Sequence, residues 1–232
     1  TIPIPPLRVQ ARIVEILDKF TQLEAELEAE LEARKKQYAY YRDQLLNFSQ
    51  CPPLNVNIEW KTLGEVCKIK NGKDHKHLSH GDIPVYGSGG IMKYVDEATY
   101  NKPSVLIPRK GSLNNLFYVD TPFWNVDTIY YTEINTNHIL PKFLYHYLAT
   151  RELEKMNLAG GVPSLTQTTL KTIPIPLPPL SEQRRIVDIL DRFDTLTNSI
   201  SEGLPKEIAL RRKQYEYYRD ALLNFPRAEV TA

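Results

Sequence analysis

The 232-residue sequence has few cysteines, no long apolar run and no excess of charge of either sign. Its two cysteines, Cys51 and Cys67, are too few for a disulfide framework and favour a reducing, cytoplasmic location. No apolar run approaches the ~20 residues of a membrane-spanning helix, and no signal peptide opens the chain. The net charge of +1 excludes an acidic tail protein and a histone-like polycation.

Motifs of common enzymatic chemistries are also absent from the sequence. It contains no glycine-rich dinucleotide fingerprint, no P-loop, no G-x-S-x-G elbow and no H-E-x-x-H zinc motif. The Asn-Pro-Pro-aromatic or Asp-Pro-Pro-aromatic tetrapeptide of amino-methylating enzymes is missing too. His75, His77 and His80 lie close together, but their spacing fits no standard zinc pattern, even with Cys67. We therefore expect no catalytic residue, no metal and no cofactor on this chain.

The chain does contain an internal repeat. Residues 7–20 recur as 180–193, and residues 34–48 recur as 211–225 with 12 of 15 positions identical. A T-I-P-I-P stretch precedes each copy, and the second copy has four extra residues between its matched blocks. Such proline-rich lead-ins are not helical, so we expect them to be extended.

Both copies predict long helices, because apolar and aromatic residues recur at alternating three- and four-residue steps, as in a coiled-coil seam. Two successive four-residue steps at Leu23, Leu27 and Leu31 form a stutter. Gly203 and Pro205 predict a break in the second copy. The expected seam positions are Ile13, Ile16, Phe20, Leu23, Leu27, Leu31, Arg34, Tyr38, Tyr41, Leu45, Phe48, Ile186, Ile189, Phe193, Leu196, Ile200, Ile208, Tyr215, Tyr218, Leu222 and Phe225.

The segment between the copies has a different composition, with all five histidines and both tryptophans. Runs of β-branched and aromatic residues predict strands at 66–70, 83–86, 104–107 and 128–132, and residues 142–156 predict an amphipathic helix. We therefore expect an α+β fold, in which two long antiparallel coiled-coil helices flank one mixed α/β domain. The expected domains are a helical arm over 1–50, the mixed domain over 51–171 and a second helical arm over 172–232.

Polar loops of the mixed domain are candidates for DNA contacts. The domain has 13 Lys/Arg and 11 Asp/Glu, so its net charge is small, but its basic and amide residues cluster. Arg and Lys pair with guanine, Asn and Gln with adenine, and Lys or Ser with phosphate. The candidates are Lys70, Lys73 and His75; Arg109, Lys110, Ser112, Asn114 and Asn115; Thr166 and Gln167; and, around a glycine-rich turn, Tyr86, Ser88 and Lys93. The alternative is that these are solvated loops without a ligand.

The two arms resemble those of a known family. Each has the form I-P-x-P-P-L-x-x-Q-x-x-I-V-x-I-L-D-x-F and ends in K-Q-Y-x-Y-Y-R-D-x-L-L-x-F, and the mixed domain opens with W-K-T-L-G-E from Trp60. This pattern, which covers nearly the whole chain, resembles the specificity subunit of type I restriction–modification systems, especially the IC-like class. Two A-E-L-E repeats, at 25–28 and 29–32, resemble the ruler of that class, whose length sets the gap between the halves of the DNA target.

The resemblance implies a non-catalytic DNA-reading subunit. Its mixed domain would be a target-recognition domain for one half of a bipartite sequence on double-stranded DNA. Its arms would separate two such domains and bind methylation subunits, which carry S-adenosylmethionine and modify adenine. Separate restriction subunits would join through the complex and cut unmodified DNA.

Two questions stay open at this point. A complete specificity subunit has two recognition domains, whereas this chain has one and matches the C-terminal half. It is either a shortened half-subunit that forms a homodimer or pairs with another half-subunit, or a fragment. The alternative functions are a coiled-coil protein–protein interaction module without DNA reading and, more distantly, an enzyme with a cryptic metal or methyl-transfer site.

Overall fold

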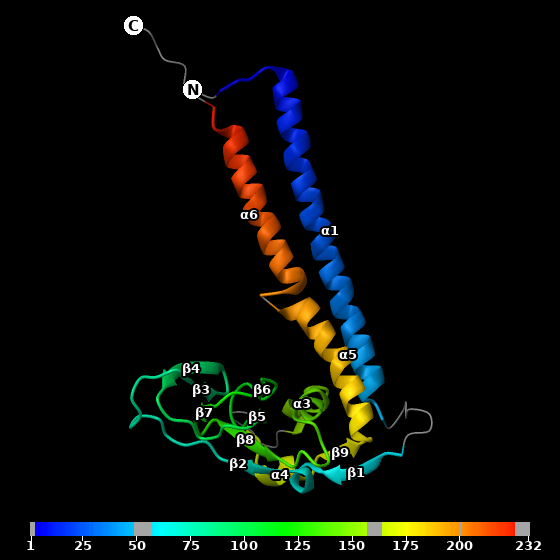
Figure 1. Ribbon diagram of the computed structural model, residues 1–232, viewed down its shortest axis with the longest axis vertical. Helices are drawn as coiled ribbons and strands as arrows, with labels where there is room; N and C mark the ends of the chain where they lie inside the picture. Colours follow the sequence, from blue (N-terminus) through cyan, green and yellow to red (C-terminus); the bar gives the residue numbers. More distant parts are fainter. Residues whose placement is uncertain (1–2, 49–56, 157–163, 200, 226–232) are drawn as a thin grey trace. The chain divides into compact units, whose positions relative to one another are not determined.

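The computed structural model describes residues 3–48, 57–156, 164–199 and 201–225. They fall into two compact units, one formed by residues 1–41 and 190–232 and the other by residues 42–189 (Figure 1). The first unit is helical and the second mixes helices with sheets, which confirms the expected fold class. The functional division at 50/51 and 171/172 stays a prediction.

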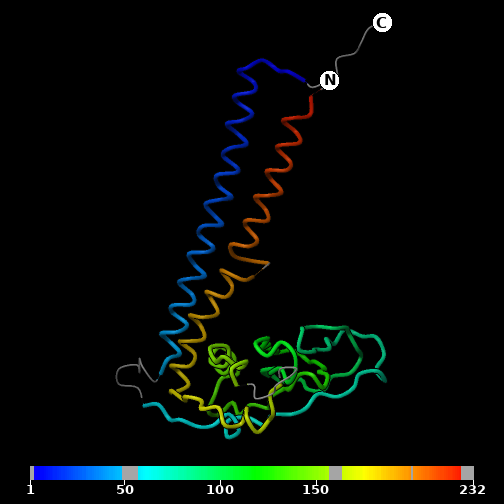
Figure 2. Tube along the Cα trace, turned by 180° about the vertical axis from the view of Figure 1, so that it is seen from behind, coloured from blue at the N-terminus to red at the C-terminus, as the bar shows by residue number. Residues whose placement is uncertain are grey.

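The helical unit consists of α1 (Leu7–Leu46) up to Tyr41, α5 (Leu180–Asn198) from Leu190 onward, and α6 (Gly203–Leu223). The ring of Phe20 stacks on Tyr218 with centroids 5.2 Å apart. Toward the other end of α1, Tyr41 stacks on Phe193 at 5.7 Å. The start of α1 thus meets the end of α6, so the helices pack antiparallel, as expected (Figure 2).

The expected break separates α5 from α6. Helix α5 ends at Asn198 and α6 begins at Gly203, which leaves four positions between them. The second copy of the repeat is longer by the same number of residues. Gly203 has a φ of +73°, which favours glycine, and Pro205 lies in the first turn of α6, where its missing N–H is no loss. The extra residues are therefore accommodated outside the helices, and aromatic contacts with α1 form on both sides of the break.

The seam is buried at only some of its expected positions. Ile13 and Ile208 are buried, but Leu23 is 44% exposed and Tyr41 is 41% exposed. Tyr41 and Tyr218 still contact the facing helix through the ring stacks with Phe193 and Phe20, whereas the expected burial of Leu23 was wrong, because two helices cover only one side of each apolar stripe. Ile200 lies outside the described residues. Arg212 joins the helices beside the stutter through ion pairs with Glu24 and Glu28.

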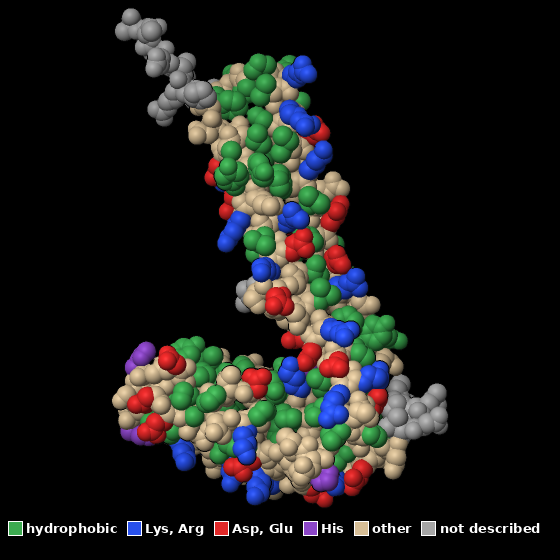
Figure 3. Space-filling view, viewed as in Figure 1, with side chains coloured by type: hydrophobic (Ala, Val, Ile, Leu, Met, Phe, Trp, Pro, Cys, Tyr) green, Lys and Arg blue, Asp and Glu red, His purple; other side chains and the backbone are tan. Residues whose placement is uncertain are grey.

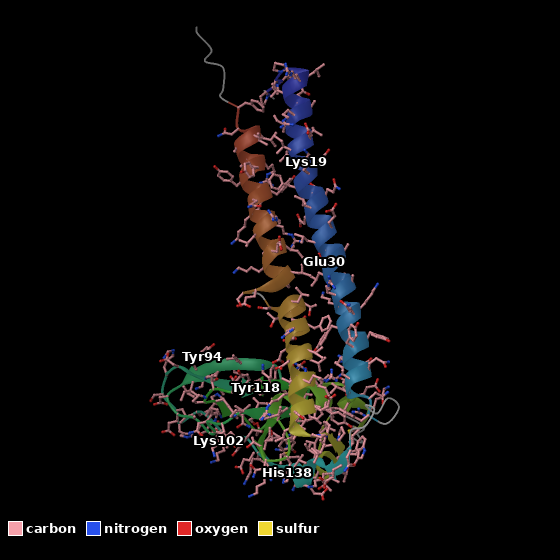
Figure 4. The ribbon with its side chains drawn as sticks, turned by 45° about the vertical axis from the view of Figure 1, so that its right-hand side comes forward. Lys19, Glu30, Tyr94, Lys102, Tyr118 and His138 are labelled. Atoms are coloured by element: carbon pink, nitrogen blue, oxygen red, sulfur yellow. The ribbon has the colours of Figure 1, made fainter. Side chains whose placement is uncertain are left out.

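The outer surface of α1 is charged and carries helical ion pairs. Lys19 pairs with Glu15 at 3.3 Å and Arg34 with Glu30 at 3.3 Å, each four residues apart. Figure 4 labels Lys19 and Glu30 on this helix. Such pairs contribute about 0.2–0.5 kcal/mol each to helix stability, so most of the stability must come from packing. None of the helices among the described residues is both long and apolar enough to span a membrane.

The described residues of the mixed unit form three sheets. The largest has the order β2 (Cys67–Lys70), β8 (Ile129–Ile134), β5 (Ser104–Pro108) and β6 (Phe117–Val119). The second has the order β4 (Gly90–Val95), β3 (Ile83–Gly87) and β7 (Trp124–Asn125). The four strand predictions are confirmed to within about two residues. The third sheet pairs β1 (Glu59–Thr62) with β9 (Pro174–Leu177). The proline-rich stretch before the second copy of the repeat is therefore extended, as expected.

Besides the ends of α1 and α5 that belong to it, the described part of this unit has four short helices. They are α2 (Leu63–Val66), α3 (Pro141–Ala149), a 3₁₀ turn over Leu153–Met156 and α4 (Gln167–Lys171). The single helix expected over 142–156 was wrong. A continuous helix would place Arg151 on the buried face below Tyr147. Instead the helix ends, the Arg151 guanidinium lies 4.4 Å from the centre of the Tyr147 ring, and the chain turns so that Leu153 is buried.

Two apolar clusters lie in the part of the core formed by the two larger sheets. One contains Leu106, Val119, Phe123, Ile129 and Tyr131, and the other contains Val85, Val95, Trp124 and Val126. Adjacent residues, Phe123 and Trp124, belong to different clusters because side chains alternate along a strand. The chain from 123 to 129 therefore connects the two sheets and fixes the loops at their ends.

Candidate nucleic-acid interface

The strand ends of the mixed unit bring separate loops to one edge. In the larger sheet, the last residues of β2 and β5, Lys70 and Pro108, pair with Tyr131 and Ile129 at the start of β8. In the second sheet β3 and β7 are parallel and end together. We call residues 70–75, 86–90, 108–115, 125–128 and 164–167 the loop edge.

Hydrogen bonds to the backbone and side chain of Thr128 hold two of these loops together. The N–H of Arg109 donates to the carbonyl oxygen of Thr128 at 2.9 Å. The N–H of Ser88 donates to the Thr128 hydroxyl at 3.3 Å, and the Asn115 side-chain amide donates to the Ser88 carbonyl at 3.2 Å. The glycine-rich turn and the Arg109 loop are therefore neighbours.

The remaining loops join through a second set of contacts. The N–H of Leu165 donates to the Arg109 carbonyl at 2.9 Å. The Gln167 side chain donates to the Asn71 side chain at 3.1 Å, and the N–H of Lys73 donates to the Asn125 carbonyl at 2.9 Å. Residues from all three predicted loops thus share one surface.

Basic side chains line this surface. Lys70, Lys73 and Lys110 are exposed, and the Arg109 guanidinium reaches the Asp127 carbonyl at 3.5 Å. Lys70 lies 3.9 Å from Glu133, which is a weak, solvated pair. Lys and Arg side chains are visible on the side of the unit where β2 and α4 lie, interspersed with acidic residues (Figure 3). Exposed lysines of this kind suit contacts with phosphate.

Asp74 is the acidic residue within the first loop. Desolvation raises the pKa of its carboxyl, but backbone N–H groups of His75 and Lys76 and their charges outweigh it, so the pKa is lowered. The hydrogen bonds measure 2.8 and 3.3 Å. This carboxylate therefore stabilises the loop backbone.

The other candidates lie in different surroundings. Tyr86 packs against Phe117 and Phe123 in the core, and burial raises the pKa of its hydroxyl, with smaller contributions from Tyr94 and Asp120. Tyr94 itself is exposed on β4 (Figure 4).

The remaining candidates differ in exposure. His75 and Lys93 are half-buried together, with the Lys93 ammonium 3.5 Å from the His75 carbonyl. Ser112 and Thr166 are exposed on the loop edge. Asn114 points elsewhere, lining a cavity of about 610 Å³ with residues of α3 and the end of α1.

Three residues outside the candidate list shape the loop edge. They are Asn71, which bonds to Gln167; Thr128, which joins two loops; and Asn125, which is fully buried and donates to the Ile129 carbonyl at 2.8 Å. The sequence contained a signal for Asn71 as a site residue, since it lies among the basic residues of the first loop. For Asn125 and Thr128, the only signal in the sequence was their position in a short polar run before a strand.

Gly72 lets the first loop approach the 125–126 backbone. A Cβ at this position would lie 2.0 Å from the Val126 carbonyl oxygen. We expect Gly72→Ala to lower the free energy of unfolding by about 2–3 kcal/mol, because the backbone must move. Urea unfolding measures this. Gly89→Ala is the control, since a Cβ there meets nothing within 4 Å. Equal stability of the two variants would contradict the close approach.

The histidine loop does not assemble a metal site with Cys67. Across the described ranges, no three His, Cys, Asp or Glu side chains are grouped as metal ligands would be. The Cys67 thiol is buried and donates to the Leu63 carbonyl at 3.3 Å. Burial raises the pKa of this thiol to about 12. Cys51 lies outside the described residues.

Cys67 should be chemically silent in the folded protein. At pH 8 only roughly one thiol in ten thousand is ionised when the pKa is about 12, and the thiolate is the reactive form. In a Cys51→Ser background, we expect iodoacetamide to label Cys67 at least ~1000-fold more slowly in buffer than in guanidinium. Mass spectrometry reads the labelling. Rapid labelling of the folded protein would mean that Cys67 is accessible.

Comparison with known proteins identifies the family. A family model described as the type I restriction modification DNA specificity domain matches residues 55–210. The EcoR124I/EcoR124II specificity subunit of Escherichia coli is 40% identical, with 100% of this chain and 65% of the relative covered. The putative subunit S.HindORF215P of Haemophilus influenzae is 39% identical, with 97% and 63% covered. The chain thus spans just under two thirds of these two relatives.

A shorter relative and two solved structures support the same family assignment. The putative subunit S.MpnORF201P of Mycoplasma pneumoniae is 32% identical, with 97% of this chain and 95% of the relative covered. The type I S subunit structure from M. genitalium has a TM-score of 0.63 at 24% identity, covering 96% of this chain and 62% of that one. The HsdS structure from Thermoanaerobacter tengcongensis has a TM-score of 0.60 at 22% identity, with 96% and 59% covered. The structures support the fold, and with the sequence matches they show that this chain belongs to the type I restriction–modification specificity subunit family.

Proposed function

We propose that this chain is a non-catalytic DNA-reading subunit whose loop edge recognises one half of a bipartite target. The observation that carries the proposal is the convergence of loops from distant parts of the sequence on one surface. That surface holds exposed lysines for phosphates and amide side chains for base edges. The sheets and their buried core hold it in place, which suits a rigid reading surface.

The protein partners of this chain are inferred from its family. The helical arms bind the methylation subunits, and these carry S-adenosylmethionine for adenine modification. Restriction subunits join through the complex. In this account the chain itself binds DNA and protein and holds no cofactor.

The repeat supports a further partner at the end of the helical unit where α1 begins and α6 ends. Gln183 is fully buried; its Nε2 donates to the Pro178 carbonyl at 2.9 Å, and its amide also bonds to the backbone of residues 138–140. Its copy, Gln10, repeats the first bond by donating to the Pro5 carbonyl at 2.7 Å. In the described part of the chain, the side-chain oxygen of Gln10 accepts no hydrogen bond.

Apolar residues at the same end repeat this contrast. Each is exposed, while its copy in the mixed unit is buried: Ile4 at 85% against Leu177 at 7%, Val14 at 55% against Val187 at 8%, and Leu223 at 50% against Leu46 at 1%. Their copies pack within the mixed unit. We therefore propose that this end binds a second mixed unit, supplied by another part of a longer chain or by another half-subunit, including a second copy.

Val14→Asp tests this pairing. The substitution places a carboxylate on the proposed contact, and burying it unpaired is costly. We expect it to lower the mass of the complex with methylation subunits, measured by light scattering, while thermal unfolding of the chain stays unchanged. Lys19→Asp on the same helix is the control. The same mass for wild type and Val14→Asp would contradict the pairing.

Binding-site selection tests DNA reading. The chain is combined with its methylation subunits and a random duplex library, and bound sequences are recovered. The proposal predicts enrichment of a defined half-site. Full assembly with no enrichment of any sequence would favour the coiled-coil interaction module instead, and S-adenosylmethionine binding to the chain alone would favour an enzyme.

A further inference from the structure

Two amide side chains on the loop edge, an exposed asparagine and a half-buried glutamine, form a hydrogen-bonded pair. Asn71 directly follows β2 and Gln167 is the first residue of α4, 96 positions later. The Gln167 Nε2 donates to the Asn71 Oδ1 at 3.1 Å, and this hydrogen bond is exposed. Among the described residues, the Asn71 Nδ2 and the Gln167 Oε1 have no further partner.

This single bond leaves a specific set of groups available. The bond engages the Gln167 amino group, through one of its two N–H donors, and the Asn71 oxygen, through one lone pair; the two groups left wholly unbonded are the Asn71 amino group, a donor, and the Gln167 carbonyl, an acceptor. Exchanging O and N in both amides again leaves one unbonded amino group and one unbonded carbonyl. The pair therefore offers a donor beside an acceptor in either orientation.

One base edge matches this set. In the major groove adenine presents N7 as an acceptor and its N6 amino group as a donor. Guanine presents two acceptors there, N7 and O6, which leaves the carbonyl of the pair facing an acceptor. The pair is therefore complementary to adenine and discriminates against guanine.

The backbone positions of both residues are fixed. Gly72 packs closely against the Val126 carbonyl, which holds the residue before it. Thr166 caps α4 by accepting from the Thr169 N–H at 3.1 Å, and Leu165 bonds to Arg109. Lys70 and Lys73 flank Asn71 and are exposed for phosphate contacts. A preorganised amide pair between two cations is suited to reading a base in a groove.

We propose that Asn71 and Gln167 together read one adenine of the half-site through the major groove. This inference rests on the proposed DNA-reading function. It assigns a shared role to two residues, so removing either one should have nearly the same effect as removing both.

The test is binding-site selection with the chain and its methylation subunits. We expect Asn71→Ala, Gln167→Ala and the double variant each to reduce the preference for adenine at the same single position by about 5- to 150-fold. Other positions should keep their preferences. Asn101→Ala, an exposed asparagine outside the loop edge, is the matched control and should select the wild-type sequence.

A second variant separates reading from structural support. Asn71→Asp replaces the donor with an acceptor, so the pair now accepts from the base. We expect preference at that position to move from adenine toward cytosine, whose N4 amino group donates in the major groove. Loss of a structural contact would not redirect the preference.

The outcomes are distinct. Unchanged preference at every position in both alanine variants would overturn the inference, as would a loss of affinity that is equal on all sequences. In either case a wild-type protein that selects a half-site still supports the proposed function. A wild-type protein that selects nothing would refute that function, and the adenine assignment with it.

Discussion

Replacing Lys70, Lys73 and Lys110 together with alanine is expected to reduce DNA affinity by roughly 100-fold or more at physiological salt. Each lysine that neutralises a phosphate releases counterions, so the slope of log affinity against log salt should fall by about 2.7 for three contacts. All three side chains are exposed on the loop edge. Fluorescence anisotropy over a salt series measures both quantities on the complex with methylation subunits.

A charge-matched variant controls for net charge. Lys61, Lys155 and Lys171 belong to the same unit but lie outside the loop edge, on β1, the 3₁₀ turn and α4. Replacing these three with alanine should leave both the affinity and the salt slope close to wild type. If the two triple variants lost affinity equally, the loop edge would not be the surface that meets DNA.

Deleting residues 29–32 is expected to shorten the gap between the two half-sites while leaving their sequences unchanged. Four residues of helix span about 6 Å, which corresponds to one or two base pairs. Phe20 contacts Tyr218 on one side of the deletion, and Tyr41 contacts Phe193 on the other. Removing one helical turn should therefore shift Phe20 from Tyr218 toward Tyr215, one turn earlier along α6.

Mapping of methylated adenines measures the gap. Glu30→Ala with Glu32→Ala is the control, because it changes the charge of the repeat and keeps its length; its gap should equal that of wild type. An unchanged gap in the deletion variant would show that the arm does not set the spacing. A changed half-site would show that the arm also affects reading.

The helical arms were largely predictable because their signals are local. Apolar spacing, the repeat and the absence of Gly or Pro specify α1, and Gly203 with Pro205 specifies the break. The exposure of Leu23 was not predictable, because it depends on how much of each stripe a neighbouring helix covers.

The loop edge was predictable only in part. Clusters of basic and amide residues indicated three loops, but their convergence depends on strand order and register. The bond between Asn71 and Gln167 joins residues 96 positions apart, and no local pattern pairs them. Tyr86 and Asn114 were chosen for residue type and proximity to a turn, yet one packs in the core and the other lines a separate cavity.

Exchange of the mixed domain tests the central claim most directly. Residues 57–171 are replaced by the aligned segment of the Escherichia coli EcoR124I/EcoR124II relative, and methylated adenines are mapped across the genome in cells that supply the methylation subunits. If this segment reads DNA, the half-site should change to that of the donor segment while the gap stays the same. An unchanged methylation map in an assembled, active complex would contradict the account.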